Sequence, residues 1–101
     1  MKDIALITGA SEGIGFEFSN LLAEKNYDLI LTARNLEKLL QIKSLLENKY
    51  SVKVYILPKD LSKENSAQEL YNDIKKLDLH ITTLINNAGF GDYGKFFRNR
   101  P

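Results

Sequence analysis

The sequence contains no cysteine and only one histidine among its 101 residues. The missing cysteines exclude disulfides, thiolate metal sites and cysteine nucleophiles, and a single histidine excludes a multi-histidine metal site. Neither sign of charge dominates, because 14 Lys and Arg side chains face 13 Asp and Glu side chains. This balance gives no reason to expect a nucleic acid as partner.

Long apolar runs are missing as well. No run exceeds five residues, whereas a membrane-spanning helix needs roughly 20. Residues 1–7 lead directly into Thr8-Gly9, which leaves too short a segment for a signal peptide. With 44% hydrophobic and 27% charged residues, the composition is that of an ordinary globular domain. We therefore expect a cytoplasmic protein with no membrane partner.

Short apolar segments alternate with longer segments of helical periodicity. The apolar runs at 4–7, 29–31, 52–57 and 84–85 predict strands, the first buried on both faces and the third nearer an edge. Between them, apolar side chains at helical spacing predict three amphipathic helices, carried by Ile14, Phe18, Leu21 and Leu22, by Leu36, Leu39, Leu40, Ile42, Leu45 and Leu46, and by Ala67, Leu70, Ile74 and Leu77.

Two polar residues mark expected helix ends. Asn26 tolerates the left-handed conformation and is expected to end the first helix. Ser62 is a good N-cap and Glu64 suits a first helical turn, so the third helix is expected to begin there.

The alternation β-α-β-α-β-α-β predicts an α/β protein whose parallel strands are joined by right-handed crossovers. In a doubly wound, Rossmann-like sheet these strands take the order 3-2-1-4, and the sheet is incomplete because the fourth strand is left as an unpaired edge. Ligands bind beyond the carboxyl ends of the strands at the switch point, here between the first and fourth strands. We therefore expect function in the turns after Ile7 and Ile85.

A glycine-rich turn occupies the first of these places, at residues 8–15. Gly9 lets the chain leave the strand tightly, Gly13 lets the backbone approach a ligand, and Gly15 permits close packing of the helix. Free amides at the start of the helix favour a pyrophosphate, to which Ser11 can add a hydroxyl contact. The alternative is a turn whose glycines serve packing alone. No Lys-Ser/Thr pair follows Gly13, which excludes an ATPase-type phosphate loop.

Two motifs resemble those of the short-chain dehydrogenase/reductase family. They are Thr-Gly-x-x-x-Gly-Ile-Gly at 8–15 and Asn-Asn-Ala-Gly at 86–89, on the two turns that flank the predicted switch point. The resemblance runs from about residue 3 to Phe97. Together with the residue-level reasoning, it implies a cofactor-binding set of Gly9, Ser11, Gly13, Ile14, Gly15, Arg34, Asp60, Leu61, Asn86, Ala88 and Gly89.

The end of the second strand indicates which dinucleotide binds. NAD-specific members of such folds place an acidic residue there, whereas a nearby Arg accommodates the 2′-phosphate of NADP. This sequence has Ala33 followed by Arg34, which predicts NADP(H) in preference to NAD(H). Glu12 is a departure, because many NADP-preferring members of the family carry a basic residue in the glycine turn. The alternative is a solvated surface Arg.

The resemblance gives roles to two further segments. Asp60, followed by Leu61, is similar to the family's Asp that binds the adenine amino group; a turn or surface Asp is the alternative. Asn86 to Gly89 are implied to brace the sheet and to line the ribose on the nicotinamide side. A purely structural role is the alternative, and for Asn87 both readings stay open.

The catalytic pair of the family lies beyond its Asn-Asn-Ala-Gly motif. There a Tyr-x-x-x-Lys pair, aided by Ser and Asn, delivers the proton for hydride transfer between the cofactor and a carbonyl or alcohol. Here Tyr55 with Lys59 and Tyr71 with Lys75 have this spacing. The first pair lies on a strand ended by proline and the second on a flanking helix, so both are expected to be structural, as is His80. No residue is predicted to be catalytic.

The preferred hypothesis is an N-terminal fragment of an NADP-dependent short-chain oxidoreductase that is inactive alone. Residues 1–97 would form the first part of its NADP-binding Rossmann domain, and residues 98–101 lack the apolar periodicity of a following helix. The full parent would act on a small carbonyl or alcohol and form a homo-oligomer. The alternative is a stand-alone nucleotide-binding or self-associating module that uses its open sheet face and edge.

Overall fold

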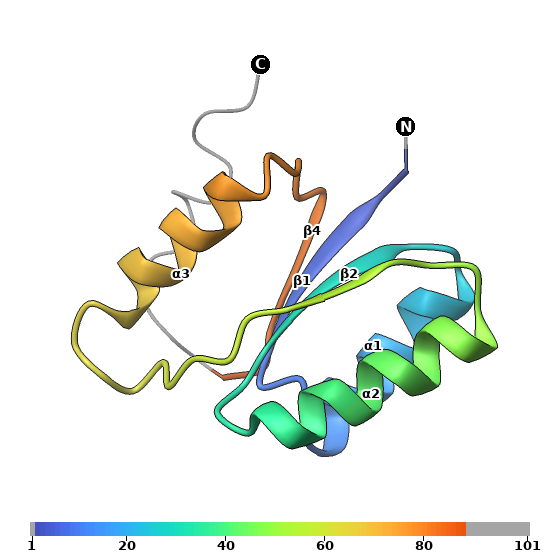
Figure 1. Cartoon of the computed structure of the whole chain (residues 1–101), viewed down its shortest axis with the longest axis horizontal. Coiled ribbons are helices and arrows are strands. Elements are labelled where there is room, and N and C mark those ends of the chain that lie inside the picture. Colours follow the sequence, from blue (N-terminus) through green and yellow to red (C-terminus); the bar gives the residue numbers. More distant parts are fainter. Residues whose placement is uncertain (1, 89–101) are drawn as a thin grey trace.

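The computed structural model describes residues 2–88, which form one parallel α/β unit (Figure 1). The strands are β1 (Ile4–Thr8), β2 (Asp28–Thr32), β3 (Val54–Ile56) and β4 (Thr83–Asn86), and the helices are α1 (Gly13–Glu24), α2 (Leu36–Lys49) and α3 (Ser66–Lys76). The predicted alternation of strands and helices is confirmed.

The sheet has the order β3-β2-β1-β4, with all neighbouring strands parallel. Ile7 of β1 lies opposite Leu31 of β2 and Ile85 of β4, so these three strands end at the same edge. Figure 1 shows α1 and α2 on one side of the sheet and α3 on the other. This is the predicted doubly wound, Rossmann-like arrangement, and among the described residues β4 pairs only with β1.

Both faces of the central strand β1 are covered, which explains why its five residues are all buried. The core on one face includes Ala5, Ile7, Leu29 and Leu31 of the sheet, with Ala23, Leu39 and Leu46 of α1 and α2. The core on the other face includes Leu6 and Ile30 of the sheet, with Leu70 and Ile74 of α3. Within residues 2–88 no helix has the length and apolarity to cross a bilayer.

Only part of the apolar stripe predicted for the first helix faces the core: Leu22 packs against it, partly buried. Ile14, Phe18 and Leu21 are 60%, 36% and 44% exposed. The residues that α1 buries are the small ones, Gly15, Ser19 and Ala23. Small side chains let the helix lie close to the sheet, and the Ser19 hydroxyl is satisfied by donating to the Gly15 carbonyl at 2.9 Å. In α2, likewise, Leu36, Leu40 and Leu45 remain about half exposed.

Local hydrogen bonding corrects one expected helix end and supports another. Asn26 adopts a left-handed φ of 71° just after α1, as predicted. Ser62, however, does not cap α3, because its hydroxyl and its backbone N–H both donate to Asp60 Oδ1, at 2.6 and 3.0 Å. A run of turns follows, so Glu64 also precedes the helix, which begins only at Ser66. The third strand is likewise shorter than the predicted 52–57.

Candidate functional site

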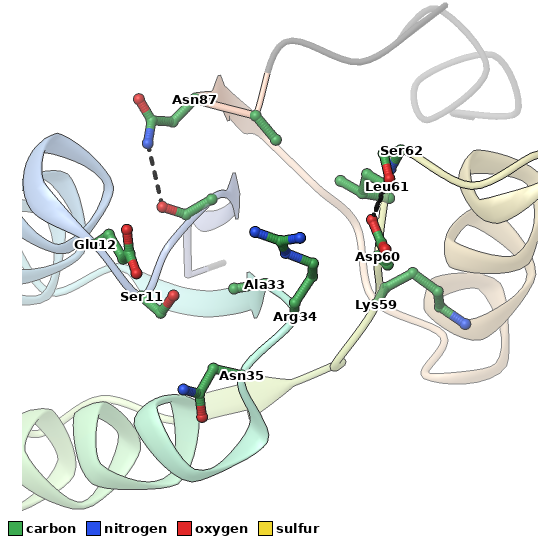
Figure 2. A pocket seen from close by; sticks show the side chains of 12 residues that line it. Ser11, Glu12, Ala33, Arg34, Asn35, Lys59, Asp60, Leu61, Ser62 and Asn87 are labelled. Atoms are coloured by element: carbon green, nitrogen blue, oxygen red, sulfur yellow. Dashed lines mark hydrogen bonds between the residues drawn. The ribbon is translucent and has the colours of Figure 1, made fainter.

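A cleft of about 940 Å³ lies at the carboxyl ends of the strands. Its lining comes from the turns after β1, β2, β3 and β4, and consists of Gly9, Ser11, Glu12, Ala33, Arg34, Asn35, Lys59, Asp60, Leu61, Ser62, Asn87 and Ala88. Figure 2 shows the glycine turn and the Asp60–Ser62 segment on opposite sides, with Arg34 between them. The place is the one predicted from the strand order.

The glycine turn requires glycine at three positions, for two different reasons. Gly9 and Gly13 have positive φ values of 62° and 45°, a region that side-chain-bearing residues rarely adopt. Gly15 has no such φ, but a Cβ there would collide with the Gly9 carbonyl oxygen and lie 3.1 Å from Ala10 Cα. Gly15 of the helix therefore packs closely against the backbone of the glycine turn, at Gly9 and Ala10. A Cβ at Gly13, in contrast, would meet no atom within 4 Å, so this side of the turn is open.

The start of α1 is left available to a ligand. Glu12 precedes the helix in an extended conformation and makes no side-chain cap hydrogen bond. The Gly15 N–H donates to the Glu12 carbonyl at 3.0 Å, which leaves the amides of Gly13 and Ile14 without a partner among residues 2–88, and the helix dipole makes this end positive. At α2 the situation is reversed, because Asn35 Oδ1 accepts from the Lys38 N–H at 3.1 Å.

The turn after β4 is tied to the turn after β1. Thr8 Oγ1 donates to Asn86 Oδ1 at 2.9 Å and accepts from the Ala88 N–H at 3.0 Å. Asn87 Nδ2 donates to the Gly9 carbonyl at 3.2 Å, as the dashed line in Figure 2 shows. These bonds brace the central sheet and fix the positions of the two turns relative to each other.

The Arg34 guanidinium extends into the cleft from the end of β2 (Figure 2). Among residues 2–88 it has no hydrogen-bond or ion-pair partner. The neighbouring Ala33 places no carboxylate at this strand end. A cation of fixed geometry with free donors is therefore presented to whatever occupies the cleft.

Asp60 faces Arg34 from the turn after β3. The hydroxyl and backbone N–H of Ser62 hold the pKa of Asp60 below its ordinary value, and the positive charge of Arg34 lowers it further. Both Ser62 bonds are to Oδ1. The second oxygen of an ionised carboxylate is thus left to accept from a ligand.

Lys59 is a second cation on the cleft lining, but its charge is directed elsewhere. Its Nζ lies 3.0 Å from Asp73 Oδ2 and 3.6 Å from Glu69 Oε1, both on α3. The hydrogen bond to Asp73 raises the pKa of Lys59, and Glu69 adds to the effect. In Figure 2 its side chain extends away from Arg34, so Lys59 fastens α3 to the end of β3.

The structure brings most of the predicted site residues to one place. Gly9, Ser11, Arg34, Asp60, Leu61 and Ala88 line the cleft. Gly13, Ile14, Gly15 and Asn86 lie in the adjoining turns without lining it, and Gly89 lies outside the described residues. The lining residues Asn35, Lys59 and Ser62 and the buried Thr8 were not predicted. Lys59 and Thr8 contact segments distant in the sequence, whereas Asn35 and Ser62 bond locally, to Lys38 and Asp60.

No Tyr–Lys pair reaches the cleft from the described part of the chain. Tyr71 and Lys75 are on α3, and Tyr55 is on β3 beside the core that α3 covers. Within residues 2–88 there is also no group of three or more His, Asp or Glu side chains that could hold a metal ion.

Known proteins similar to this chain combine the same fold with redox chemistry. The very-long-chain 3-oxoacyl-CoA reductase of Candida glabrata is 44% identical over 89 residues, which are 86% of this chain and 25% of that protein. The reductase of the same name from Pyrenophora tritici-repentis is also 44% identical, over 84% of this chain and 26% of that protein. The chain thus spans about a quarter of the length of these curated relatives.

Solved structures give a matching result. An alcohol dehydrogenase of Thermococcus sibiricus, complexed with 5-hydroxy-NADP, matches with a TM-score of 0.78 and 31% identity, over 83% of this chain and 36% of that one. L-sorbose reductase of Gluconobacter frateurii, complexed with NADPH and L-sorbose, matches with a TM-score of 0.80 and 26% identity, over 90% of this chain and 35% of that one. The family model for short chain dehydrogenase matches residues 3–99, and the chain therefore belongs to the short-chain dehydrogenase family.

Proposed function

We propose that residues 1–97 carry the dinucleotide-binding part of an oxidoreductase that uses NADP(H) in preference to NAD(H). Three parts of the cleft support a dinucleotide: the open glycine turn with the uncapped start of α1, the guanidinium at the end of β2, and the carboxylate after β3. These are the groups that a pyrophosphate, a phosphorylated ribose and an adenine amino group require.

The pyrophosphate would lie against the glycine turn. Open space at Gly13 and the uncapped amides of α1 fit an anion that approaches the backbone, and Ser11 adds a hydroxyl on the cleft lining. Gly9, on the cleft lining, and Gly15 are proposed to belong to the same cofactor-binding set, since they give the turn the shape that admits the ligand. Ile14, 60% exposed, is proposed to cover the cofactor from the side of α1.

Arg34 is the single observation that carries the preference for NADP(H). Its guanidinium reaches into the cleft without a partner among residues 2–88, and Ala33 leaves no carboxylate to accept the ribose hydroxyls of NAD. A phosphate suits this fork of donors. Asp60, with one carboxylate oxygen unbonded, is proposed to accept from the adenine amino group beside Leu61.

The nicotinamide group would supply the hydride chemistry when bound. The chain's own residues would hold and orient the cofactor, and the segment 86–89 would position its nicotinamide-side ribose through Asn86, Ala88 and Gly89. The full protein would interconvert a carbonyl and an alcohol. The identity with 3-oxoacyl-CoA reductases favours a ketone within an acyl thioester as its substrate.

The preference is tested by titrating the chain with NADPH and with NADH, using calorimetry. We expect NADPH to bind at least about tenfold more tightly, because a phosphate on a free Arg gains charge-assisted hydrogen bonds. Arg34→Asp should remove this advantage and shift the preference toward NADH. Lys25→Asp, the same charge reversal at an exposed residue just after α1 and outside the lining, should leave the preference in place. Unchanged or tighter NADPH binding by Arg34→Asp would contradict the proposal.

A second candidate function is a nucleotide-binding module that associates with itself. The exposed apolar side chains of α1, Ile14, Phe18 and Leu21, together with the outer edge of β4, favour it. Sedimentation equilibrium separates the two proposals. A dimer that forms reversibly and is lost in Phe18→Ser would support the module, whereas a monomer at all concentrations would exclude it.

A further inference from the structure

Glu12, on the lining of the cleft, forms an ion pair with Lys38. Lys38 Nζ lies 3.4 Å from Glu12 Oε1, which joins the glycine turn to the first turn of α2. Glu12 lines the cleft, as does Asn35, whose side chain accepts from the Lys38 backbone N–H. Lys38 is not itself a lining residue, but it is held to two residues that are.

The pair is weak enough to exchange partners. The Lys38 and Glu12 side chains are 48% and 77% exposed, and ion pairs of this kind contribute little to stability because water and salt screen them. A phosphate carries more charge than one carboxylate and offers more acceptor oxygens, so it competes well for the same ammonium group. Nothing in the fold requires the Glu12 contact to persist.

The cleft lining also offers little positive charge to a phosphate. Lys59 is committed to Asp73 and Glu69, so Arg34 is the one lining cation without an ion-pair partner among residues 2–88. Glu12 adds a negative charge to the lining at the glycine turn. A phosphate beside Arg34 would therefore meet one cation and an opposing carboxylate unless a second cation came from nearby.

We propose that Lys38 is this second cation: it binds the 2′-phosphate of NADP(H) together with Arg34, and Glu12 is the partner that it releases on binding. This inference rests on the proposed function of the cleft. It assigns to Lys38 the role of a specificity residue and explains how an acidic residue in the glycine turn is compatible with a phosphate ligand. Glu12 then lowers the affinity for the phosphate without abolishing it.

The test compares 2′,5′-ADP with 5′-AMP, two ligands that differ by the phosphate in question, by NMR titration of the 101-residue chain. Lys38→Gln should weaken 2′,5′-ADP binding by about threefold to tenfold and leave 5′-AMP within about twofold. Lys38→Arg, which keeps the charge, should restore the affinity. Glu12→Gln should strengthen 2′,5′-ADP binding by about twofold to fivefold, and this gain should shrink in the Lys38→Gln background.

Lys49→Gln is the matched control, because it removes the same charge from the far end of α2. An equal loss in Lys49→Gln and Lys38→Gln would overturn the inference, since it would reveal only the overall charge. A wild-type preference for 2′,5′-ADP that is lost in Arg34→Met but kept in Lys38→Gln would also overturn it, while the proposed function stood. If the wild-type chain does not distinguish the two ligands, the proposed cofactor preference itself fails, and the role of Lys38 fails with it.

Discussion

The sheet has a hollow at each end, and the two hollows differ in whether their charged side chains are paired with other residues of the chain. At the amino end, a hollow of about 600 Å³ contains Asp28 and Glu47 among its lining residues. Asp28 Oδ1 forms an ion pair with Lys2 Nζ at 3.1 Å and accepts from the Lys53 N–H at 2.8 Å. At the carboxyl end, Arg34 has no such partner among residues 2–88. The charged groups at the amino end thus hold strands together, whereas the carboxyl end combines the paired Lys59 with an Arg34 that has no such partner in the described part of the chain.

This difference shows that a hollow with charged residues does not by itself indicate a binding site. Glu47 Oε2 accepts from the Val54 N–H at 2.8 Å and from Lys43 Nζ at 3.0 Å, so this carboxylate closes the outer edge of β3. A group used in this way has little to offer a ligand. Among residues 2–88, the carboxyl end is the one that presents unpartnered donors, on Arg34 and at the Gly13 and Ile14 amides of α1.

The glycine turn is where a single substitution should disturb the carboxyl end most. Gly15→Ala would place a methyl group onto the Gly9 carbonyl oxygen, and backbone atoms cannot move aside as a flexible side chain can. We expect a loss of about 3 kcal/mol or more in the free energy of unfolding, despite the roughly 1 kcal/mol by which Ala is favoured over Gly in a helix. Urea unfolding followed by circular dichroism measures it.

Gly13→Ala is the control in the same turn. Its methyl group would meet no atom within 4 Å, so only the positive φ of 45° opposes it, at a cost of about 1 kcal/mol. Equal losses in the two variants would show that the steric account of Gly15 is wrong.

The sequence was sufficient to predict the strand order and the position of the cleft. These depend on local features: a buried apolar run, a glycine turn and a helix, followed by two more strand–helix units without glycine and a fourth strand. Ala33 and Arg34 could be interpreted for the same reason, because their roles follow from their place at the end of β2. The structure confirms the order and places Arg34 in the cleft.

Hydrogen bonds that compete with a local pattern, and contacts between distant segments, could not be predicted from the local sequence patterns. Ser62 has the chemistry of an N-cap, yet the nearer Asp60 carboxylate takes both of its donors. Helical spacing identified α1, but it could not indicate that the sheet would be approached by Ser19 and Ala23 rather than by Phe18. The bonds from Thr8 to the segment after β4 span 78 to 80 residues, and sequence spacing carries no sign of them.

Glu47→Ala should weaken the amino end without affecting nucleotide binding. The substitution leaves the Val54 N–H and the Lys43 ammonium group without the carboxylate that joins them. Because the Glu47 side chain is 31% exposed, water replaces part of the interaction, and we expect a loss of about 1 to 2 kcal/mol. Glu17→Ala, on the exposed face of α1, is the control and should change stability by less than about 0.5 kcal/mol.

The same carboxylate predicts a pH dependence. The Val54 N–H holds the pKa of Glu47 below its ordinary value of 4.5, and Lys43 lowers it further. A lowered pKa in the folded state means that the stabilisation is complete above the ordinary value and is lost as the pH falls below it. The stability difference between wild type and Glu47→Ala should therefore shrink in urea unfolding at about pH 3 compared with pH 7. A difference that stays constant would contradict this assignment.

Lys59→Met should have the smallest effect on stability. It tests the comparison between the two ends of the sheet most directly, because Lys59 lies at the carboxyl end but forms ion pairs, like the charged residues at the amino end. Its bonds to Asp73 and Glu69 should contribute about 0.5 to 1 kcal/mol. Since Asp73 raises the pKa of Lys59, this stabilisation is complete below the ordinary value and is lost as the pH rises through the raised one. NADPH affinity should change by less than about twofold, far less than in Arg34→Met. If Lys59→Met and Arg34→Met lost equal NADPH affinity, Lys59 would have to leave its acidic partners to bind the ligand. The presence of ion pairs would then not distinguish the amino end of the sheet from the carboxyl end.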